Sequence, residues 1–291
     1  MSSAVAAPLA CVAELLRCPA CRSPLAAVQG SLICAHRHTY DVARSGYVTL
    51  LPNARRCPIG DDASMIATRA AIMDDGHFEP LTTALAEKVR SLALPDSAVI
   101  LDAGAGTGHH LAGVLAELPG ALGVAVDVSR AASRRATRAH HRIARVRSDI
   151  WQEIPLCDAT VDLTMSVFAP RNAQELARVL RPGGAAVVAT PAPEHLQELA
   201  CLHAVNVHPH KAIHLQRLFT AWASADRVQR VSWVLRLTHR DVARLLTMGP
   251  AAHHLRPDFL VQLAALSEPL CVTAAVELRT FRSATNTWPS L

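Results

Sequence analysis

Apolar and polar positions follow two different periods along this chain, and from residue 98 onward the two periods alternate. Short apolar runs predict buried strands at 99–101, 122–126, 143–147, 161–168 and 185–189. The segments between them predict helices at 107–118, 130–141 and 173–180. This alternation is typical of a doubly wound α/β fold with a mostly parallel sheet.

The end of this region predicts a strand at 228–237, a helix at 240–246 and a last strand at 271–281. A late helix and strand that return to the sheet favour the seven-stranded, Rossmann-like sheet of class I methyltransferases over the sheet of dehydrogenases. We therefore assign 98–291 to one α/β domain of this methyltransferase type.

The first part of the chain has a different pattern. Short alternating segments at 31–34 and 47–51 predict strands of a small β-module, which we place at 1–52. Helices are expected at 63–74 and 80–92. We assign 53–97, which begins with a turn-rich stretch, to a linker and helical lead-in.

Composition adds a candidate partner. Hydrophobic residues make up 51% of the chain and charged residues 18%, as in an ordinary globular protein. The net charge of +5 is carried by 27 Arg and only two Lys. Guanidinium groups bind phosphates in a planar, bidentate way, so this surplus suits a polyanionic partner. Aromatic residues are only 4% of the chain, which predicts no obvious platform for stacking bases.

Two locations are excluded by the same pattern. Apolar runs such as 183–192 are much shorter than the ~20 residues that span a bilayer, so we expect no membrane partner. The N-terminus lacks a charged segment followed by an apolar one, and we expect no secretory signal. The expected location is the cytoplasm.

The cysteines near the N-terminus have the spacing of a metal site. Cys18-Pro-Ala-Cys21 is followed after twelve residues by Cys34-Ala-His-Arg-His38. Two such pairs close a tetrahedral sphere around Zn²⁺ with no open position, so the predicted ion is structural. The fourth ligand is His36 or His38, and the Cys-x3-His spacing favours His38.

A glycine-rich segment stands between the first strand and first helix of the large domain. Its sequence is Asp102-Ala-Gly104-Ala-Gly106-Thr107-Gly108. Glycines allow a sharp turn and a close approach of the backbone to a ligand that faces the helix N-terminus. This loop alone would also fit a dinucleotide site.

Acidic residues around the loop narrow the ligand to S-adenosylmethionine. Asp102 is placed to pair with the methionyl ammonium through water. Asp127 ends the next strand, 19 residues after Gly108, where a carboxylate accepts hydrogen bonds from the ribose hydroxyls. Asp149 ends the third strand and is placed to meet the adenine amino group. A dehydrogenase would share the first two features but not the third.

These motifs together give the chain a family resemblance, which covers about residues 15–200. The matching stretches are the zinc motif, 40–41 with 46–52, 76–81, the glycine loop, 168–170, and 189–191 with 195–196. In them the chain resembles the 23S ribosomal RNA guanine-N1 methyltransferases, and specifically the actinomycete members that confer tylosin-type macrolide resistance.

The resemblance implies an activity, a partner and two further site residues. It implies N1-methylation of a guanine in a hairpin of domain II of 23S rRNA, near the peptide exit tunnel, by a homodimer with a basic RNA cleft. It also implies that Phe78 and His195 line the cofactor pocket, although Phe78 also fits a core position and His195 a helix start. A small-molecule methyltransferase of an antibiotic pathway and a non-catalytic RNA-binding module stay open as alternatives.

Other residues are weaker candidates. Arg130, Arg134 and Arg138 share one helix face, which is either solvated or a phosphate-contact stripe. Arg55 and Arg56 in the linker are the better candidates for RNA contact. A histidine run at 203–214 lacks accompanying carboxylates and does not favour a second metal, and 248–250 fits either a pocket lip or a helix stop. Removal of the guanine N1 proton requires a base or a solvent path, and no residue is identified as that base.

Overall fold

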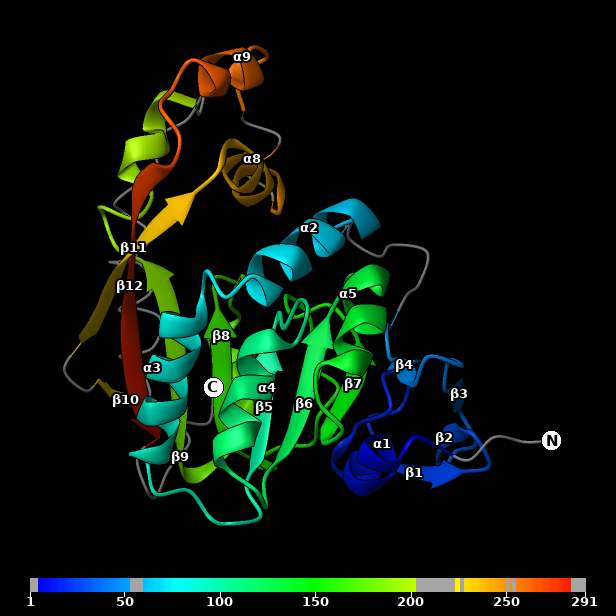
Figure 1. Ribbon diagram of the computed structural model, residues 1–291. Helices are drawn as coiled ribbons and strands as arrows, with labels where there is room; N and C mark the ends of the chain where they lie inside the picture. The colour runs from blue at the N-terminus through cyan, green and yellow to red at the C-terminus, as the bar shows by residue number, and fades with distance from the viewer. Residues whose placement is uncertain are drawn as a thin grey trace.

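Two sheets and the helices around them make up the structure, a computed structural model that describes residues 5–52, 60–202, 223–225, 228–249, 252 and 255–283 (Figure 1). A three-stranded antiparallel sheet near the N-terminus contains β1 (Leu25–Val28), β2 (Ser31–Cys34) and β3 (Thr39–Asp41). It is preceded by α1 (Ala7–Val12) and η1 (Ala13–Leu15), and β4 (Tyr47–Thr49) follows it.

The large sheet has nine described strands in the order β10-β12-β9-β8-β5-β6-β7-β4, with β11 also pairing with β12. Their bounds are β5 Val99–Ala103, β6 Leu122–Asp127, β7 Ile143–Arg147, β8 Val161–Val167, β9 Leu180–Pro191, β10 Ala223–Ala225, β11 Gln229–Leu237 and β12 Leu270–Ser283. All neighbours from β9 to β4 run parallel, while β12 runs antiparallel to β9. The doubly wound prediction is confirmed.

Seven of these strands are the expected ones, and β4 and β10 are additions. The long strand β12 pairs with β11 over 270–278 and with β10 over 281–283, so one edge receives two short partners. The strand expected at 47–51 is present as β4, and it joins the large sheet instead of the three-stranded sheet. It pairs in parallel with β7 and so extends the large sheet.

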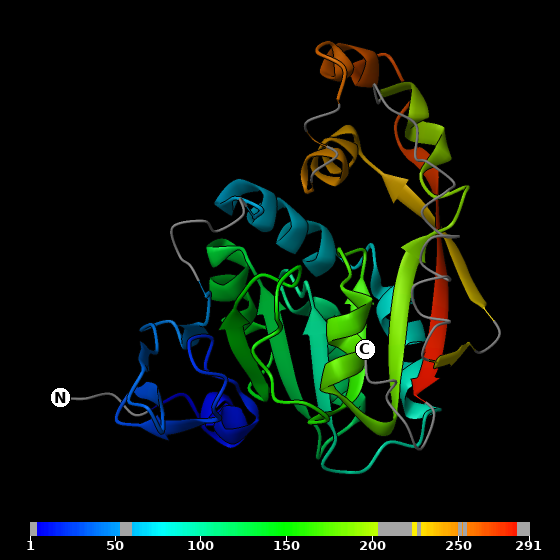
Figure 2. The ribbon, with the colours of Figure 1, turned by 180° about the vertical axis from the view of Figure 1, so that it is seen from behind.

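Helices cover both faces of the large sheet (Figures 1 and 2). They are α3 (Glu79–Arg90), α4 (His109–Glu117), α5 (Arg130–Arg135) with η3 (Ala136–Arg138), and α6 (Ala173–Val179), while α2 (Ala63–Asp74) lies over the carboxyl edge of the sheet. Alternate residues of β5 enter opposite cores: Ile100 packs with α3 and α4, and Leu101 packs with α1 and α6. A strand buried on both faces explains why these runs are continuously apolar.

Helix α2 begins and ends where the pattern predicted, because the Asp62 side chain accepts hydrogen bonds from two N–H groups of its first turn. The helix expected at 130–141 ends earlier. After Arg135 the chain forms the 3₁₀ turn η3, and the N–H of Ala139 donates to the carbonyl of Ala136. This tighter turn leaves only a few residues before β7 begins at Ile143.

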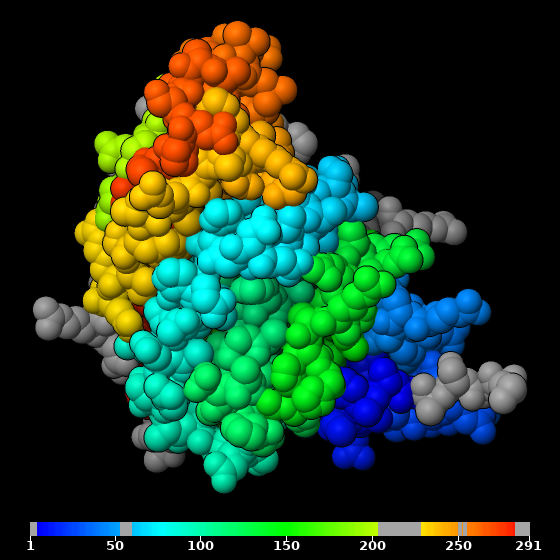
Figure 3. Space-filling model, viewed as in Figure 1, coloured from blue at the N-terminus to red at the C-terminus, as the bar shows by residue number. Residues whose placement is uncertain are grey.

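The C-terminal elements stand above the carboxyl edge of the sheet. They are η4 (Gln197–Leu202), α8 (His239–Thr247) and α9 (Phe259–Ala264), next to the ends of β11 and β12 (Figure 1). In the space-filling view α2 and the C-terminal segment lie against each other (Figure 3). The Arg69 side chain of α2 donates to the carbonyl of Met248 at the end of α8, 2.7 Å away. Helix α2 is therefore held over the edge where the predicted cofactor residues meet.

Candidate cofactor and zinc sites

The four predicted zinc ligands lie together in the N-terminal module. The ligand atoms of Cys18, Cys21, Cys34 and His38 are all within 4.8 Å of one another. The Sγ atoms of Cys21 and Cys34 are 3.5 Å apart, and the Cys34 Sγ is 3.4 Å from the His38 Nδ1. A tetrahedral zinc ion with bonds of about 2.3 Å requires edges of this size, so the donor set fits Zn²⁺.

Two tight turns present these ligands. The N–H of Arg22 donates to the Cys18 carbonyl and that of Arg37 to the Cys34 carbonyl, each over 2.8 Å. Arg22 and Arg37 have φ values of 65° and 62°, the left-handed conformation that closes such turns. The alternative fourth ligand, His36, has its Nδ1 beside the Ser23 hydroxyl instead. His38 is therefore the histidine that completes the set.

Groups around the ligands favour bound metal. Hydrogen bonds from Ser23 lower the pKa of the Cys21 thiol to about 5, which favours the thiolate that zinc requires. The Tyr40 hydroxyl lies 3.2 Å from the Cys18 Sγ, where it can donate to a metal-bound thiolate.

The zinc module is joined to the large domain by backbone and charged contacts. The N–H of Arg17 donates to the Pro155 carbonyl over 3.1 Å, and its guanidinium pairs with Glu153 and Asp158. At the other junction, the N–H of Leu50 donates to the Arg147 carbonyl. The carbonyl of Leu50 accepts from the Ser148 hydroxyl, one residue before Asp149. The module therefore contacts the segment just after β7, which contains the predicted cofactor residue Asp149.

The glycine loop has the backbone that its sequence predicted. Gly104, Gly106 and Gly108 have φ values of 80°, 53° and 76°. A Cβ on Gly104 would lie 2.4 Å from the Cβ of Ala169, which requires glycine there. Gly108 caps α4 in the left-handed conformation. These glycines bring the loop backbone against the end of β8 and leave N–H groups of α4 facing the carboxyl edge.

Asp102 supplies a carboxylate oxygen that lacks a partner. The residue is buried, and no described residue bonds its Oδ1. Burial, together with the nearby charge of Asp127, raises the pKa of Asp102 to about 7. A buried acid in this state is suited to a cationic ligand, such as the methionyl ammonium group of S-adenosylmethionine.

Asp127 and Asp149 are already held by the protein. The Asp127 oxygens accept from the N–H groups of Gly106 and Ser129, each over 2.8 Å. The Asp149 oxygens accept from the Trp151 N–H and the Gln152 side chain. Each carboxylate oxygen has a second lone pair, so these contacts orient the groups and leave acceptor capacity for ribose hydroxyls and an adenine amino group.

Arg69 is a further residue at this edge that the sequence did not indicate. Its guanidinium forms an ion pair with Asp61 and lies 3.1 Å from where a Cβ on Gly106 would be. A single arginine inside a helix carries no pattern, and only the packing of α2 over the loop brings it here.

The two residues implied by resemblance lie in one aromatic cluster, which also contains Phe168 and Trp233. The Phe78 ring is 1% exposed and packs edge-on against Phe168 and Trp233, at centroid distances of 6.3 and 5.8 Å. The His195 ring lies 5.7 Å from that of Phe168, and its Nδ1 accepts from the Ala275 N–H. Burial lowers the pKa of His195 to about 4, so the ring is neutral and carries its hydrogen on Nε2.

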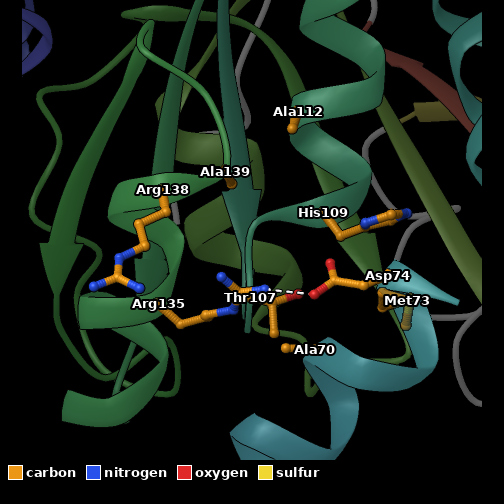
Figure 4. A pocket seen from close by; sticks show the side chains of 9 residues that line it. All are labelled: Ala70, Met73, Asp74, Thr107, His109, Ala112, Arg135, Arg138 and Ala139. Carbon is orange, nitrogen blue, oxygen red and sulfur yellow. Dashed lines mark hydrogen bonds and ion pairs between the residues drawn. The ribbon is translucent and has the colours of Figure 1, made fainter.

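A pocket of about 270 Å³ lies between α2, α4 and α5 (Figure 4). Of the predicted cofactor residues, only Thr107 lines it, beside His109, Arg138 and the Arg135–Asp74 ion pair. The pocket is thus separate from the acidic strand ends, and it gathers arginine side chains next to the glycine loop.

Six of the seven arginines of the 130–147 segment divide into two groups, and the seventh, Arg135, is half-buried and pairs with Asp74. Arg142, Arg145 and Arg147 point inward and donate to backbone carbonyls. Arg130, Arg134 and Arg138 are exposed, with Arg130 bonded to the Tyr47 hydroxyl. Arg55, Arg56 and the histidine run at 203–214 lie outside the described residues, as does Pro250. Within the described part of the chain, no helix is long and apolar enough to cross a bilayer.

Comparison with known proteins identifies both regions. Residues 16–59 match the zinc ribbon family described as "RlmA, N-terminal", and residues 100–184 match the family described as "Methyltransferase domain". Among solved structures, the YcgJ protein from Bacillus subtilis superposes with a TM-score of 0.51 at 15% identity, covering 70% of this chain and 99% of its own. This similarity shows a shared fold.

Two curated relatives match nearly the whole chain. A protein of Micromonospora griseorubida, assigned to the 23S rRNA (guanine-N1)-methyltransferases, is 44% identical over 92% of this chain and 97% of its own. The 23S rRNA (guanine(748)-N1)-methyltransferase of Streptomyces fradiae is 42% identical, covering 87% of this chain and 91% of its own.

Proposed function

The chain belongs to the 23S rRNA (guanine-N1)-methyltransferases, and from this premise we propose that it transfers a methyl group from S-adenosylmethionine to N1 of one guanine in a hairpin of domain II of 23S rRNA. The proposed consequence is resistance to tylosin-type macrolides, which act near the peptide exit tunnel beside this hairpin. The Streptomyces relative acts on guanine 748, so this is the first nucleotide to test.

The observation that carries the proposal is the buried, unpartnered Asp102 oxygen beside the glycine loop. A non-catalytic RNA-binding module would have no use for this unpaired acid. We propose that Asp102 binds the methionyl ammonium group, that Gly104, Gly106, Thr107 and Gly108 enclose the methionine part, and that Asp127 and Asp149 bind ribose and adenine. Phe78 and His195 are proposed neighbours of the cofactor, with the buried Phe78 acting through packing.

The main task of the protein in this reaction is to position the two reactants, since the cofactor supplies the reactive methyl group. S-adenosylmethionine supplies an electrophilic methyl group on a sulfonium. The chain has to hold N1 of the guanine in line with that methyl group and exclude water. The N1 proton must leave at or near the transfer step. Asp127 and Asp149 are engaged by backbone and side-chain donors, and His195 has a lowered pKa, so we assign none of them as the base.

Methyl transfer to hairpin RNA tests the proposal. The purified protein is incubated with labelled cofactor and a transcript of the domain II hairpin, and the product is mapped by mass spectrometry and by reverse-transcription stops. We expect one N1-methylguanine, and none with a transcript in which that guanine is replaced by adenine. Label in a low-molecular-weight product instead would indicate the small-molecule alternative. Expression in a macrolide-sensitive host tests resistance separately.

We further propose that the protein is a homodimer, as the resemblance implies, and that it acts in the cytoplasm. Its RNA surface would include the exposed arginines of α5 and η3, which lie beside the arginine-lined pocket. Light scattering of the free protein tests the oligomeric state.

A further inference from the structure

Phe168 lies at the end of β8, on the side of β5 that faces away from the proposed ribose and adenine residues. The sheet order places β8 on one side of β5, while β6 and β7, which carry the proposed ribose and adenine residues, lie on the other. A cofactor that spans the ends of β5, β6 and β7 therefore directs its methionine end toward β8. Phe168 directly follows β8, and the next residue, Ala169, lies against Gly104 of the cofactor loop.

The backbone of Phe168 is held in an unfavourable conformation that presents its ring. The residue has a φ of 53°, which is rare for a bulky side chain, and its N–H is fixed by the Ala189 carbonyl 3.1 Å away. Its side chain is 38% exposed although its ring packs against the buried ring of Phe78. Strain of this kind persists where the surrounding structure requires it, and it is concentrated at functional sites.

Two rings pack directly against Phe168, the buried Phe78 and the half-buried His195, and a third, Trp233, packs against Phe78. Phe78 packs edge-on at 80° to the Phe168 ring, and Trp233 packs edge-on against Phe78. Trp233 is itself fixed because its indole N–H donates to the His77 carbonyl over 2.9 Å. His195 lies beside Phe168 with its ring tilted by 30°. The cluster draws on four distant parts of the chain and leaves a supported aromatic ring at the surface.

We propose that Phe168 is the platform on which the acceptor guanine stacks after it leaves the RNA hairpin. This inference rests on the proposed function and adds the residue that positions its substrate. An unstacked base recovers stacking energy on an aromatic ring, and enzymes that modify a base commonly take it out of its helix. Trp151 is more exposed, at 62%, but it follows β7 on the adenine side of the site.

Substitutions that distinguish the aromatic face of Phe168 from its apolar bulk test the proposal. Phe168→Leu keeps an apolar side chain and the same backbone strain but removes the aromatic face, and Phe168→Tyr keeps that face. We expect F168L to lower kcat/KM for the hairpin by about 5- to 150-fold, the factor that corresponds to loss of one base–aromatic contact. F168Y should stay within a few-fold of the wild type. The dissociation constant of S-adenosylmethionine, measured by calorimetry, should stay within about twofold in both variants.

Two further measurements separate base stacking on Phe168 from phosphate contact and from loss of fold. The salt dependence of hairpin binding should keep its slope in F168L, because a stacked ring neutralises no phosphate. Thermal unfolding of both variants detects a loss of fold, and a destabilised F168L is replaced by Phe168→Met. A kcat/KM in F168L equal to that of the wild type, or an equal loss of cofactor affinity, would overturn the proposal that Phe168 is a platform. Production of N1-methylguanine by the wild type would still support the proposed function in that case. Absence of N1-methylguanine in the wild type would overturn both.

Discussion

If Asp102 binds the ammonium group of the cofactor, as proposed, cofactor binding depends on pH. Burial and the charge of Asp127 raise its pKa to about 7, so below this pH the free enzyme holds a proton that an ammonium ligand must displace. We expect the affinity for S-adenosylmethionine to fall about fivefold between pH 7 and 6, because the ionised fraction of a carboxyl group with this pKa falls from about one half to about one eleventh. Calorimetry across this range measures it. The D102N variant should bind weakly with a flatter profile, and an unchanged profile in D102N would contradict the assignment.

The same carboxyl group affects the stability of the free enzyme. Its folded pKa lies above the unfolded value of 3.8, so the folded state binds more protons between about pH 4 and 7. The contribution of Asp102 to stability is therefore present at low pH and is lost as pH rises through 7. His110 acts in the opposite direction, because burial lowers its pKa to about 3 and stability falls as pH drops below 6.5.

Gly104 permits a test of the cofactor loop with a matched control. Gly104→Ala places a Cβ 2.4 Å from Ala169, and its φ of 80° adds strain. Gly183 has nearly the same φ, 79°, but a Cβ there meets nothing within 4 Å. Both alanine variants should lose roughly 1 kcal/mol of stability to the backbone, and G104A should lose about 1–3 kcal/mol more to the clash.

The two alanine variants should also differ in cofactor affinity, because Gly104 lies in the glycine loop against Ala169 and Gly183 lies in β9. We expect G104A to weaken S-adenosylmethionine binding at least tenfold and G183A to leave it unchanged. Chemical denaturation and calorimetry give the two quantities for each variant. Equal cofactor affinities in G104A and G183A would show that the loop tolerates a side chain and would argue against close approach of the ligand.

At the scale of elements, β4 links the zinc module to the catalytic sheet. It pairs with β7, and Leu50 beyond it bonds Arg147 and Ser148 next to Asp149. Removal of zinc should therefore weaken cofactor binding as well as unfold the module, by roughly several-fold in affinity, because a metal-dependent fold and its contacts are lost together. Chelation followed by calorimetry measures this effect, and restored zinc should reverse it. Unchanged cofactor affinity in zinc-free protein would show that the two regions are energetically independent.

The sequence predicted an element correctly where the residues that determine it are close together along the chain. Helix 63–74 was predicted correctly because Asp62 and the apolar positions define it locally. The zinc ligands followed from spacing for the same reason. The pairing of β4 with β7 joins strands about 100 residues apart, and a three-residue strand carries no information about its partner.

Residues of the candidate site could be predicted only where they belong to a sequence motif. The glycine loop and the three acidic residues stand at strand ends that the alternation of strands and helices located. The aromatic cluster was missed, because a composition of 4% aromatic residues says nothing of how Phe78, Phe168, His195 and Trp233 are gathered by the fold. Arg69 was missed for a similar reason, since its position over Gly106 depends on how α2 packs.

At the scale of the whole molecule, the net charge of +5 is distributed so that α5 and η3 expose arginines beside the arginine-lined pocket. If this surface follows the RNA backbone, the double variant Arg134→Ala/Arg138→Ala removes two phosphate contacts. The slope of log affinity against log salt should then become shallower by about 1.4–1.8, since each neutralised phosphate contributes roughly 0.7–0.9. Filter binding of the hairpin at several salt concentrations measures the slope.

The control for this surface is Arg90→Ala at the end of α3, an exposed arginine that pairs with Glu117 of α4. It changes the net charge by one but should leave the slope unchanged, because the effect depends on phosphate contact and not on overall charge. If the slope falls in R90A by as much as it falls for each arginine removed in the double variant, RNA affinity depends on the overall charge of the protein. An unchanged slope in the double variant would place the RNA path on another face, and the arginines of α5 and η3 would then be a solvated helix surface.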